Sequence, residues 1–178
     1  MTTLKERSKY LSYLLRHAPE KAGLTLDKEG WCSTTQLVRN TDFTLMELDE
    51  IVRLDEKQRY SFDDELKSNI RANQGHSTEK VKITFKRAVP PTVLYHGTSD
   101  EAAAKIWAEG LKPMSRHHVH LSADLETAQA VGGRRKRDLA IFHVDAKWML
   151  ADGHQFYISD NGVWLVDAVP PKYLRLVK

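Results

Sequence analysis

The spacing of apolar residues changes along this chain of 178 residues, and the change limits the folds open to it. Near the N-terminus, apolar residues recur every three or four positions, which predicts an amphipathic helix from about Leu4 to His17. After residue 80 they alternate with polar residues, as at Val81, Ile83 and Phe85, which is typical of a β-strand. We therefore expect an α+β protein with a helical first lobe, residues 1–78, and a mixed second lobe, residues 79–178.

The first lobe has the signals of three helices followed by two strands. Ser33–Thr35 offers N-caps for a second helix, and Thr44 with Glu47 forms a capping-box pattern at the start of a third. Two short strands, residues 60–62 and 70–72, follow around an acidic turn. Three helices and a hairpin are the outline of a winged helix.

The second lobe alternates short strands with short helices. The predicted strands are residues 93–95, 119–121, 139–144 and 163–166, and the predicted helices are residues 100–109 and 124–131. His96–Thr98 is expected to form a turn after the first of these strands, because glycine is common in turns. Gly110 is expected at the C′ position of the first helix.

Composition excludes a membrane-spanning protein and a disulfide scaffold. No apolar run approaches the roughly 20 residues that cross a bilayer. The single cysteine, Cys32, cannot form an internal disulfide and is expected to be a small buried residue in a cytoplasmic protein. The net charge is only +3, and the first 80 residues hold 13 basic against 14 acidic residues. This balance favours a focused anion site over a broad basic surface for nucleic acid.

Four short polar islands suit phosphate chemistry. They are Leu15–His17, Ile70–Ser77, Leu94–Thr98 and Ser115–Ser122. Three of them hold an arginine, which is always charged and whose planar fork of donors fits phosphate oxygens. Arginine beside histidine, together with a His-Gly-Thr sequence, indicates a site for an anionic substrate.

Each island also has a simpler interpretation. Arg16 and His17 would complement the negative end of a helix dipole, and Arg71 alone in a strand would point to solvent. The histidines of 117–120 could bind a metal ion. Side chains alternate along an extended segment, however, so three histidines this close cannot all face one ion. We therefore expect no metal.

Together and in this order, the islands and the segment Asn161–Leu165 resemble the NAD-dependent RNA 2′-phosphotransferase family, over about Leu11 to Pro170. The resemblance implies a winged-helix-like first lobe that binds RNA, and an ADP-ribosyltransferase-like split β-sandwich that holds NAD in the second. The residues that it implies for gripping the RNA 2′-phosphate are Arg16, His17, Arg71 and Arg116. Those implied for NAD binding are His96, Gly97, Thr98, Gly110, Leu111, His120, Leu121 and Ser122.

The same resemblance implies a two-step reaction that consumes NAD. The RNA 2′-phosphate displaces nicotinamide from NAD, and the ribose 2″-hydroxyl then attacks phosphorus and expels the RNA 2′-hydroxyl. The products are RNA with a free 2′-hydroxyl, nicotinamide and ADP-ribose 1″,2″-cyclic phosphate. Asn161–Trp164 lacks the catalytic glutamate of many protein-modifying ADP-ribosyltransferases, which suits a phosphate that is already ionised at neutral pH. No Gly-x-Gly-x-x-Gly motif opens a helix after a strand, which also favours NAD as a consumed substrate.

Two other functions fit the same residues. An ADP-ribosyltransferase acting on terminal phosphates of nucleic acids would use the same islands, and a winged-helix RNA-binding protein could carry an inactive second lobe. Arg134–Arg137 is either a solvated loop or a contact for an RNA backbone. We expect a monomeric cytoplasmic protein that does not bind a membrane. Its expected partners are NAD and a tRNA-like RNA with an internal 2′-phosphate.

Overall fold

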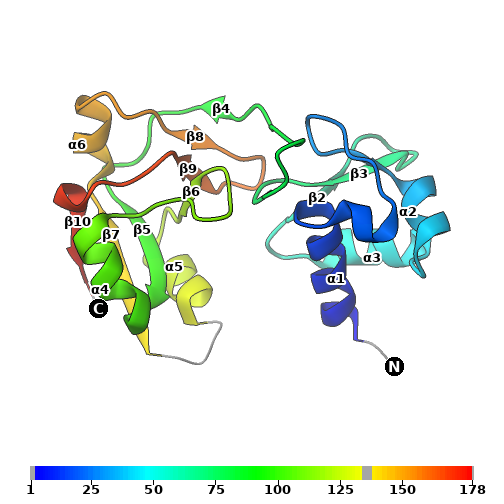
Figure 1. Ribbon diagram of the computed structural model, residues 1–178, viewed down its shortest axis with the longest axis horizontal. Coiled ribbons are helices and arrows are strands. Elements are labelled where there is room, and N and C mark those ends of the chain that lie inside the picture. Colours follow the sequence, from blue (N-terminus) through cyan, green and yellow to red (C-terminus); the bar gives the residue numbers. More distant parts are fainter. Residues whose placement is uncertain (1–2, 134–137, 178) are drawn as a thin grey trace. The chain divides into compact units, whose positions relative to one another are not determined.

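The computed structural model of the protein describes residues 3–133 and 138–177, and it divides into two compact units (Figure 1). The first unit covers residues 1–84 and the second covers residues 85–178. Six α-helices and small antiparallel sheets make up the described part of the chain. None of these helices is long and apolar enough to cross a membrane. The basic run Arg134–Arg137 lies outside the described residues.

In the first unit, residues 3–84 form three α-helices and one three-stranded sheet. Its elements are α1 (Leu4–Arg16), the 3₁₀ helix η1 (Pro19–Ala22), β1 (Cys32–Ser33), α2 (Thr34–Asn40), α3 (Leu45–Leu54), β2 (Tyr60–Phe62) and β3 (Asn69–Ala72). The three predicted helices and both predicted strands are confirmed, with ends shifted by a residue or two. Strand β1, which is too short to give a periodic pattern, was not predicted.

Side-chain hydroxyls cap the N-termini of the α-helices in the first unit. Ser33 and Thr44 accept hydrogen bonds from the backbone at the starts of α2 and α3, as the sequence predicts. At the start of α3 the Thr44 hydroxyl accepts from the Glu47 amide at 3.1 Å, and the Glu47 carboxylate binds Arg7 at 2.5 and 3.0 Å. The pKa of this carboxylate is lowered chiefly by Arg7 and also by a hydrogen bond from the Thr44 backbone. A complete capping box lies at the start of α1, between Thr3 and Glu6.

The sheet of the first unit has one apolar and one polar face. Its strand order is β1-β3-β2, and both pairs are antiparallel. Ile70 pairs with Cys32, and both are buried in the core that α1 and α3 share with the sheet. Asn69 and Arg71 flank Ile70 on β3, so their side chains lie on the opposite face. The register thus places polar side chains together on the outer face of this sheet.

The Cys32 thiol is expected to be unreactive in the folded protein. Its side chain is fully buried, and burial raises the pKa of the Cys32 thiol to about 11. Very little thiolate therefore exists at pH 8. A disulfide reagent such as Ellman's reagent should label Cys32 quickly in guanidinium chloride but only slowly in native buffer. Complete labelling of the native protein within the mixing time would contradict this placement.

The second unit begins later than the sequence predicts. Residues 81–85 form no strand, so the predicted alternating strand is wrong there. The Lys82 amide donates to the Lys28 carbonyl at 2.7 Å, and the Thr84 amide and hydroxyl donate to Glu29 at 3.1 and 3.0 Å. These bonds hold residues 82–84 on the first unit, which ends at residue 84 instead of residue 78.

In the second unit, the described residues 85–133 and 138–177 form two antiparallel sheets and three α-helices. Its elements are β4 (Lys86–Arg87), β5 (Leu94–Ser99), α4 (Asp100–Glu109), β6 (Val119–Leu121), α5 (Leu125–Gly132), β7 (Leu139–Val144), α6 (Ala146–Ala151), β8 (Tyr157–Ile158), β9 (Trp164–Val166), the 3₁₀ helix η3 (Pro171–Tyr173) and β10 (Leu174–Leu176). One sheet has the order β10-β7-β5 and the other β4-β8-β9-β6. Tyr95 and Ser122 exchange backbone hydrogen bonds of 2.9 and 2.8 Å and so join the two sheets.

The predicted turn at His96–Thr98 is wrong, because β5 continues through it to Ser99 and pairs with β7. Gly97 lies opposite Ile141 in this ladder. A Cβ added at Gly97 would lie 1.9 Å from the Ala128 carbonyl oxygen, so helix α5 crosses β5 at this glycine. Helix α5 thus approaches the backbone of β5 closely at Gly97, which gives this glycine a packing role.

Candidate functional site

Arg16 ends helix α1 and lies against the segment that follows β3. The residue is only 8% exposed. A Cβ added at Gly75 would lie 3.7 Å from three atoms of the Arg16 side chain, including its guanidinium carbon. The Ser77 amide donates to the Arg16 carbonyl at 3.0 Å. Residues 75–77 therefore hold the end of α1 in place and border the Arg16 guanidinium.

His17 is held by the same segment. It is the C-cap of α1, and its Nδ1 lies 2.9 Å from the Ser77 hydroxyl. A hydroxyl can donate to Nδ1 or accept from it, so this bond suits neutral and protonated imidazole alike. The bond orients the ring of His17.

Replacing Ser77 with alanine should change the tautomer populations of His17. The hydrogen bond to Nδ1 disappears, and a typical bond of this kind contributes about 1 kcal/mol. Nitrogen-15 chemical shifts of the His17 ring would report the change, and Ser77→Thr should restore the wild-type shifts. Ser61→Ala is a matched control, because Ser61 donates to Asn73 at the start of the same segment and does not bind His17. Identical His17 shifts in Ser77→Ala and wild type would contradict the assigned bond.

Arg71 lies on β3 beside the loop that precedes β1. Its guanidinium carbon is 4.4 Å from the centroid of the Trp31 ring, and its Nη1 donates to the Glu29 carbonyl at 3.3 Å. His76 is buried against the same loop, since a Cβ added at Gly30 would lie 3.0 Å from its Nε2. Residues 29–31 therefore contact both Arg71 and His76. The neighbours of His76 in sequence, Gly75 and Ser77, contact Arg16 and His17.

The second unit brings together two of its predicted histidines and an arginine. His96 Nδ1 lies 3.2 Å from the His120 carbonyl oxygen, across the junction of β5 and β6. Burial lowers the pKa of His96, and the positive charge of Arg116 lowers it further, against the opposing effect of the bond to His120. His96 is therefore neutral at pH 7 and lies within the electrostatic reach of Arg116.

His96 should titrate below its ordinary value of 6.5. Because its pKa is depressed in the folded state, neutral His96 contributes stability that is complete above pH 6.5. That stability is lost as the pH falls from 6.5 toward the folded-state pKa. An NMR titration of the histidine ring protons, with His96 assigned by His96→Gln, would give the midpoint directly. A midpoint at or above 6.5 would contradict the burial that we assign to this ring.

Arg116 and its neighbouring histidines have different surroundings. The Arg116 side chain is exposed, yet partial desolvation by nearby protein atoms lowers its pKa. His118 instead packs edge-on to Phe85, with ring centroids 5.7 Å apart, and lies 3.8 Å from the Asp167 carboxylate. Within residues 3–133 and 138–177, no three His, Cys, Asp or Glu side chains lie close enough to hold a metal ion.

The other predicted NAD-binding residues are arranged on the same two strands or in the core. Thr98 lies on β5, and Ser122 pairs with Tyr95 directly after β6. Leu111 and Leu121 are buried core residues. Gly110 has a positive φ of 80°, and a Cβ there would lie 2.2 Å from the Val169 carbonyl oxygen. Leu111 pairs with Val169 through bonds of 2.8 and 2.9 Å, so backbone packing accounts for Gly110.

Comparison with known proteins identifies the family. The family model described as RNA 2′-phosphotransferase, Tpt1/KptA family, matches residues 2–168. The chain belongs to this family.

Relatives with the printed name "Probable RNA 2′-phosphotransferase" match almost the whole chain. The protein from Rhizobium leguminosarum bv. trifolii is 51% identical over 173 residues, which cover 95% of this chain and 92% of the relative. The one from Pseudomonas syringae pv. tomato is 48% identical over 177 residues, covering 97% and 94%. The one from Fusobacterium nucleatum subsp. nucleatum is 45% identical over 174 residues, covering 94% and 95%. The family resemblance of the polar islands is confirmed.

Some residues around the site of this RNA 2′-phosphotransferase family member were not predicted. Ser77 and His76 stand in the Ile70–Ser77 island, but only Arg71 was assigned a role there. Trp31 has no periodic or motif signal, and its contact with Arg71 depends on the pairing of β1 with β3. The sequence could have indicated Ser77 through its place next to His76 in a polar island, but it could not have indicated Trp31.

Proposed function

We propose that the protein removes an internal 2′-phosphate from RNA by transferring it to NAD. The observation that carries this proposal is the family match over residues 2–168. It is supported by the gathering of Arg16, His17 and Arg71 around residues 29–31 and 75–77 of the first unit. NAD enters the reaction as a substrate that is consumed.

The first unit supplies the groups for the RNA phosphate. Arg16 and Arg71 offer planar donor forks that match a dianionic phosphate, and each charge-assisted hydrogen bond contributes roughly 1.5–3 kcal/mol. His17 adds an imidazole ring that Ser77 orients. The contact of Arg71 with Trp31 restricts the guanidinium before substrate arrives, which lowers the entropic cost of binding.

The second unit has groups that fit NAD. Neutral His96 and the hydroxyl of Thr98 lie on one strand, and His120 is adjacent on β6, so imidazole and hydroxyl groups can bond ribose hydroxyls. Arg116 places a positive charge next to His96. These residues can bind and orient a ribose, and Arg116 can stabilise negative charge on an oxygen that reacts beside it.

The proposed reaction balances without water or metal. A phosphate oxygen of the RNA forms a bond to C1″ of the nicotinamide ribose, and the bond from C1″ to nicotinamide breaks, with nicotinamide leaving as a neutral base. The ribose 2″-oxygen then bonds to phosphorus as the bond from phosphorus to the RNA 2′-oxygen breaks. The 2″-hydroxyl proton ends on the RNA 2′-oxygen. Arginine donors are proposed to balance the negative charge that builds on phosphorus in this second step.

Finer fold assignments accompany this proposal. We infer a winged-helix-like lobe in the first unit from α1–α3 followed by the β2–β3 hairpin. For the second unit we infer an ADP-ribosyltransferase-like split β-sandwich, supported by two antiparallel sheets joined at Tyr95 and Ser122. The cytoplasmic location and the monomeric state stay predictions.

Dependence on NAD tests the proposal. Purified protein should release one nicotinamide for each 2′-phosphate that it removes from an RNA oligonucleotide, without added metal, and should remove none when NAD is omitted. Loss of 2′-phosphate without NAD would contradict the proposed chemistry. Nicotinamide release with ADP-ribose retained on the RNA would favour the terminal-phosphate ADP-ribosyltransferase alternative. No consumption of NAD would leave the RNA-binding alternative.

A further inference from the structure

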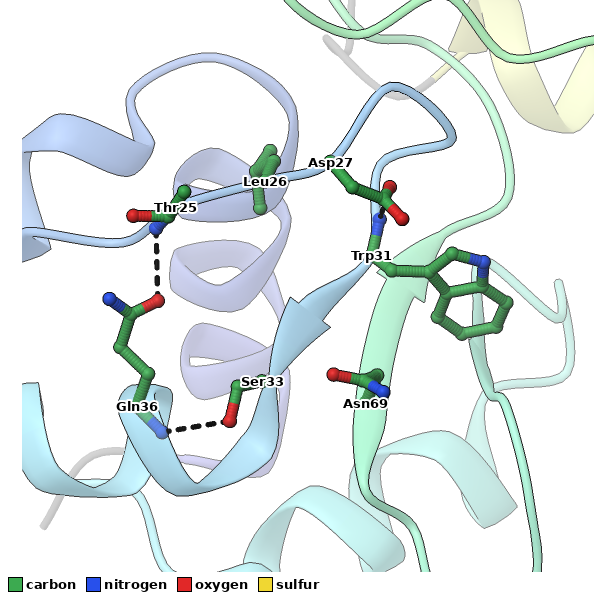
Figure 2. A pocket seen from close by; sticks show the side chains of 7 residues that line it. All are labelled: Thr25, Leu26, Asp27, Trp31, Ser33, Gln36 and Asn69. Carbon is green, nitrogen blue, oxygen red and sulfur yellow. Dashed lines mark hydrogen bonds between the residues drawn. The ribbon is translucent and has the colours of Figure 1, made fainter.

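The outer face of the sheet in the first unit carries a pocket that the phosphate-binding residues do not fill. The pocket measures about 550 Å³, within the range of small-molecule sites. Its lining residues are Thr25, Leu26, Asp27, Trp31, Ser33, Gln36 and Asn69 (Figure 2). Apart from Trp31, which restricts Arg71, these side chains have no part in the proposed chemistry of the phosphate.

The sheet register connects this pocket to Arg71. Ser33 pairs with Asn69, and the two residues share the outer face with Arg71, which is two positions further along β3. Trp31 directly precedes β1 and lines the pocket. The guanidinium carbon of Arg71 lies 4.4 Å from the centroid of the Trp31 ring. A group bound in the pocket would therefore lie next to the arginine that we assign to the RNA 2′-phosphate.

Internal hydrogen bonds fix the walls of the pocket. The side-chain oxygen Oε1 of Gln36 accepts from the Thr25 backbone amide at 3.0 Å, and the Asp27 carboxylate accepts from the Trp31 backbone amide at 2.8 Å (Figure 2). The Asn69 side-chain amide donates to Asp63. These bonds hold the pocket in one shape before a ligand arrives, so little ordering is needed on binding.

The chemistry of the lining selects the class of ligand. A carboxylate at Asp27 disfavours a second phosphate in the pocket but can accept from the amino group of a base. The Trp31 indole offers an aromatic surface, and bases stack on such surfaces in single-stranded RNA recognition. We propose that this pocket binds a base of the RNA next to the 2′-phosphate, with Trp31 as the stacking residue. The inference rests on the proposed function, because it names the part of the RNA that accompanies the phosphate.

An RNA that lacks one base tests the inference without turnover. Binding of single-stranded oligonucleotides with one internal 2′-phosphate would be measured without NAD, with an abasic residue at the phosphorylated nucleotide or at either neighbour. One of the three abasic RNAs, the one that lacks the base bound in the pocket, should bind to the wild-type protein about tenfold more weakly than the intact RNA. Trp31→Leu should lose this difference, and Trp31→Phe should keep most of it. Trp148→Leu, at an exposed tryptophan on α6, should leave the difference unchanged.

Two results would overturn the inference. One is equal binding of all abasic RNAs and the intact RNA by wild type. The other is an equal loss of affinity for intact and abasic RNAs in Trp31→Leu, which would make Trp31 only a support for Arg71. Failure of the proposed function is distinguishable, because it would appear as equal binding of RNAs with and without the 2′-phosphate, whatever the effect of the missing base.

Discussion

Replacing Arg116 with alanine should slow removal of the RNA 2′-phosphate by about 100- to 1000-fold, the range for losing one donor that stabilises developing negative charge. The side chain is exposed, so its truncation should leave the temperature of unfolding within a degree or two of wild type. The loss should appear in kcat, because the proposed role of Arg116 is to balance charge that builds on phosphorus during the reaction. Single-turnover kinetics at saturating NAD and RNA would measure it.

Arg175→Ala is a suitable control for Arg116→Ala. Arg175 lies on β10, its side chain is 75% exposed, and its Nη2 is 4.0 Å from the Asp145 carboxylate. Both variants remove one exposed arginine from the second unit, so a nonspecific loss of positive charge would affect them alike. Equal rates in Arg116→Ala and wild type would show that Arg116 takes no part in the chemistry.

Replacing Gly97 with alanine should reduce the free energy of unfolding by at least about 3 kcal/mol, an effect at the upper end of those caused by overpacking. The added methyl group would lie 1.9 Å from the Ala128 carbonyl oxygen, and backbone cannot rotate away as a flexible side chain can. Helix α5 would have to move off β5, and Gly132 would no longer pack against Gly97 and Thr98. Urea denaturation followed by circular dichroism would measure the change.

Gly133→Ala is the matched control for Gly97→Ala. A Cβ at Gly133 would meet no atom within 4 Å, and the residue has ordinary right-handed backbone angles at the end of α5. We expect its free energy of unfolding to stay within about 0.5 kcal/mol of wild type. Similar stability in the two glycine variants would contradict the packing of α5 on β5.

Helices were predictable where local sequence determines them. Ser33 and Thr44 cap the helices that they were expected to cap, because an N-cap needs only its own side chain and the next backbone amides. The errors lie where distant contacts compete with local pattern. Residues 81–85 alternate like a strand, but residues 82 and 84 bond to Lys28 and Glu29, which are more than 50 positions earlier. His96–Thr98 resembles a turn, but pairing with β7 extends it.

The candidate site was predictable in part. The resemblance of the polar islands identified the family, which the relatives confirm. The support of His17 by Ser77 joins residues 60 positions apart, and no sequence pattern measures such a contact. The packing of Trp31 on Arg71 likewise depends on the antiparallel register of β1 and β3. Motifs therefore indicated which residues carry charge, and tertiary structure was needed to find what orients them.

The destination of the phosphorus atom tests the central proposal most directly. An RNA labelled with ³²P at its internal 2′-phosphate would be incubated with the protein and NAD, and the labelled products would be separated. We predict that the label leaves the RNA and appears in ADP-ribose 1″,2″-cyclic phosphate. Label released as inorganic phosphate, or label that stays on the RNA, would contradict transfer of the 2′-phosphate to NAD.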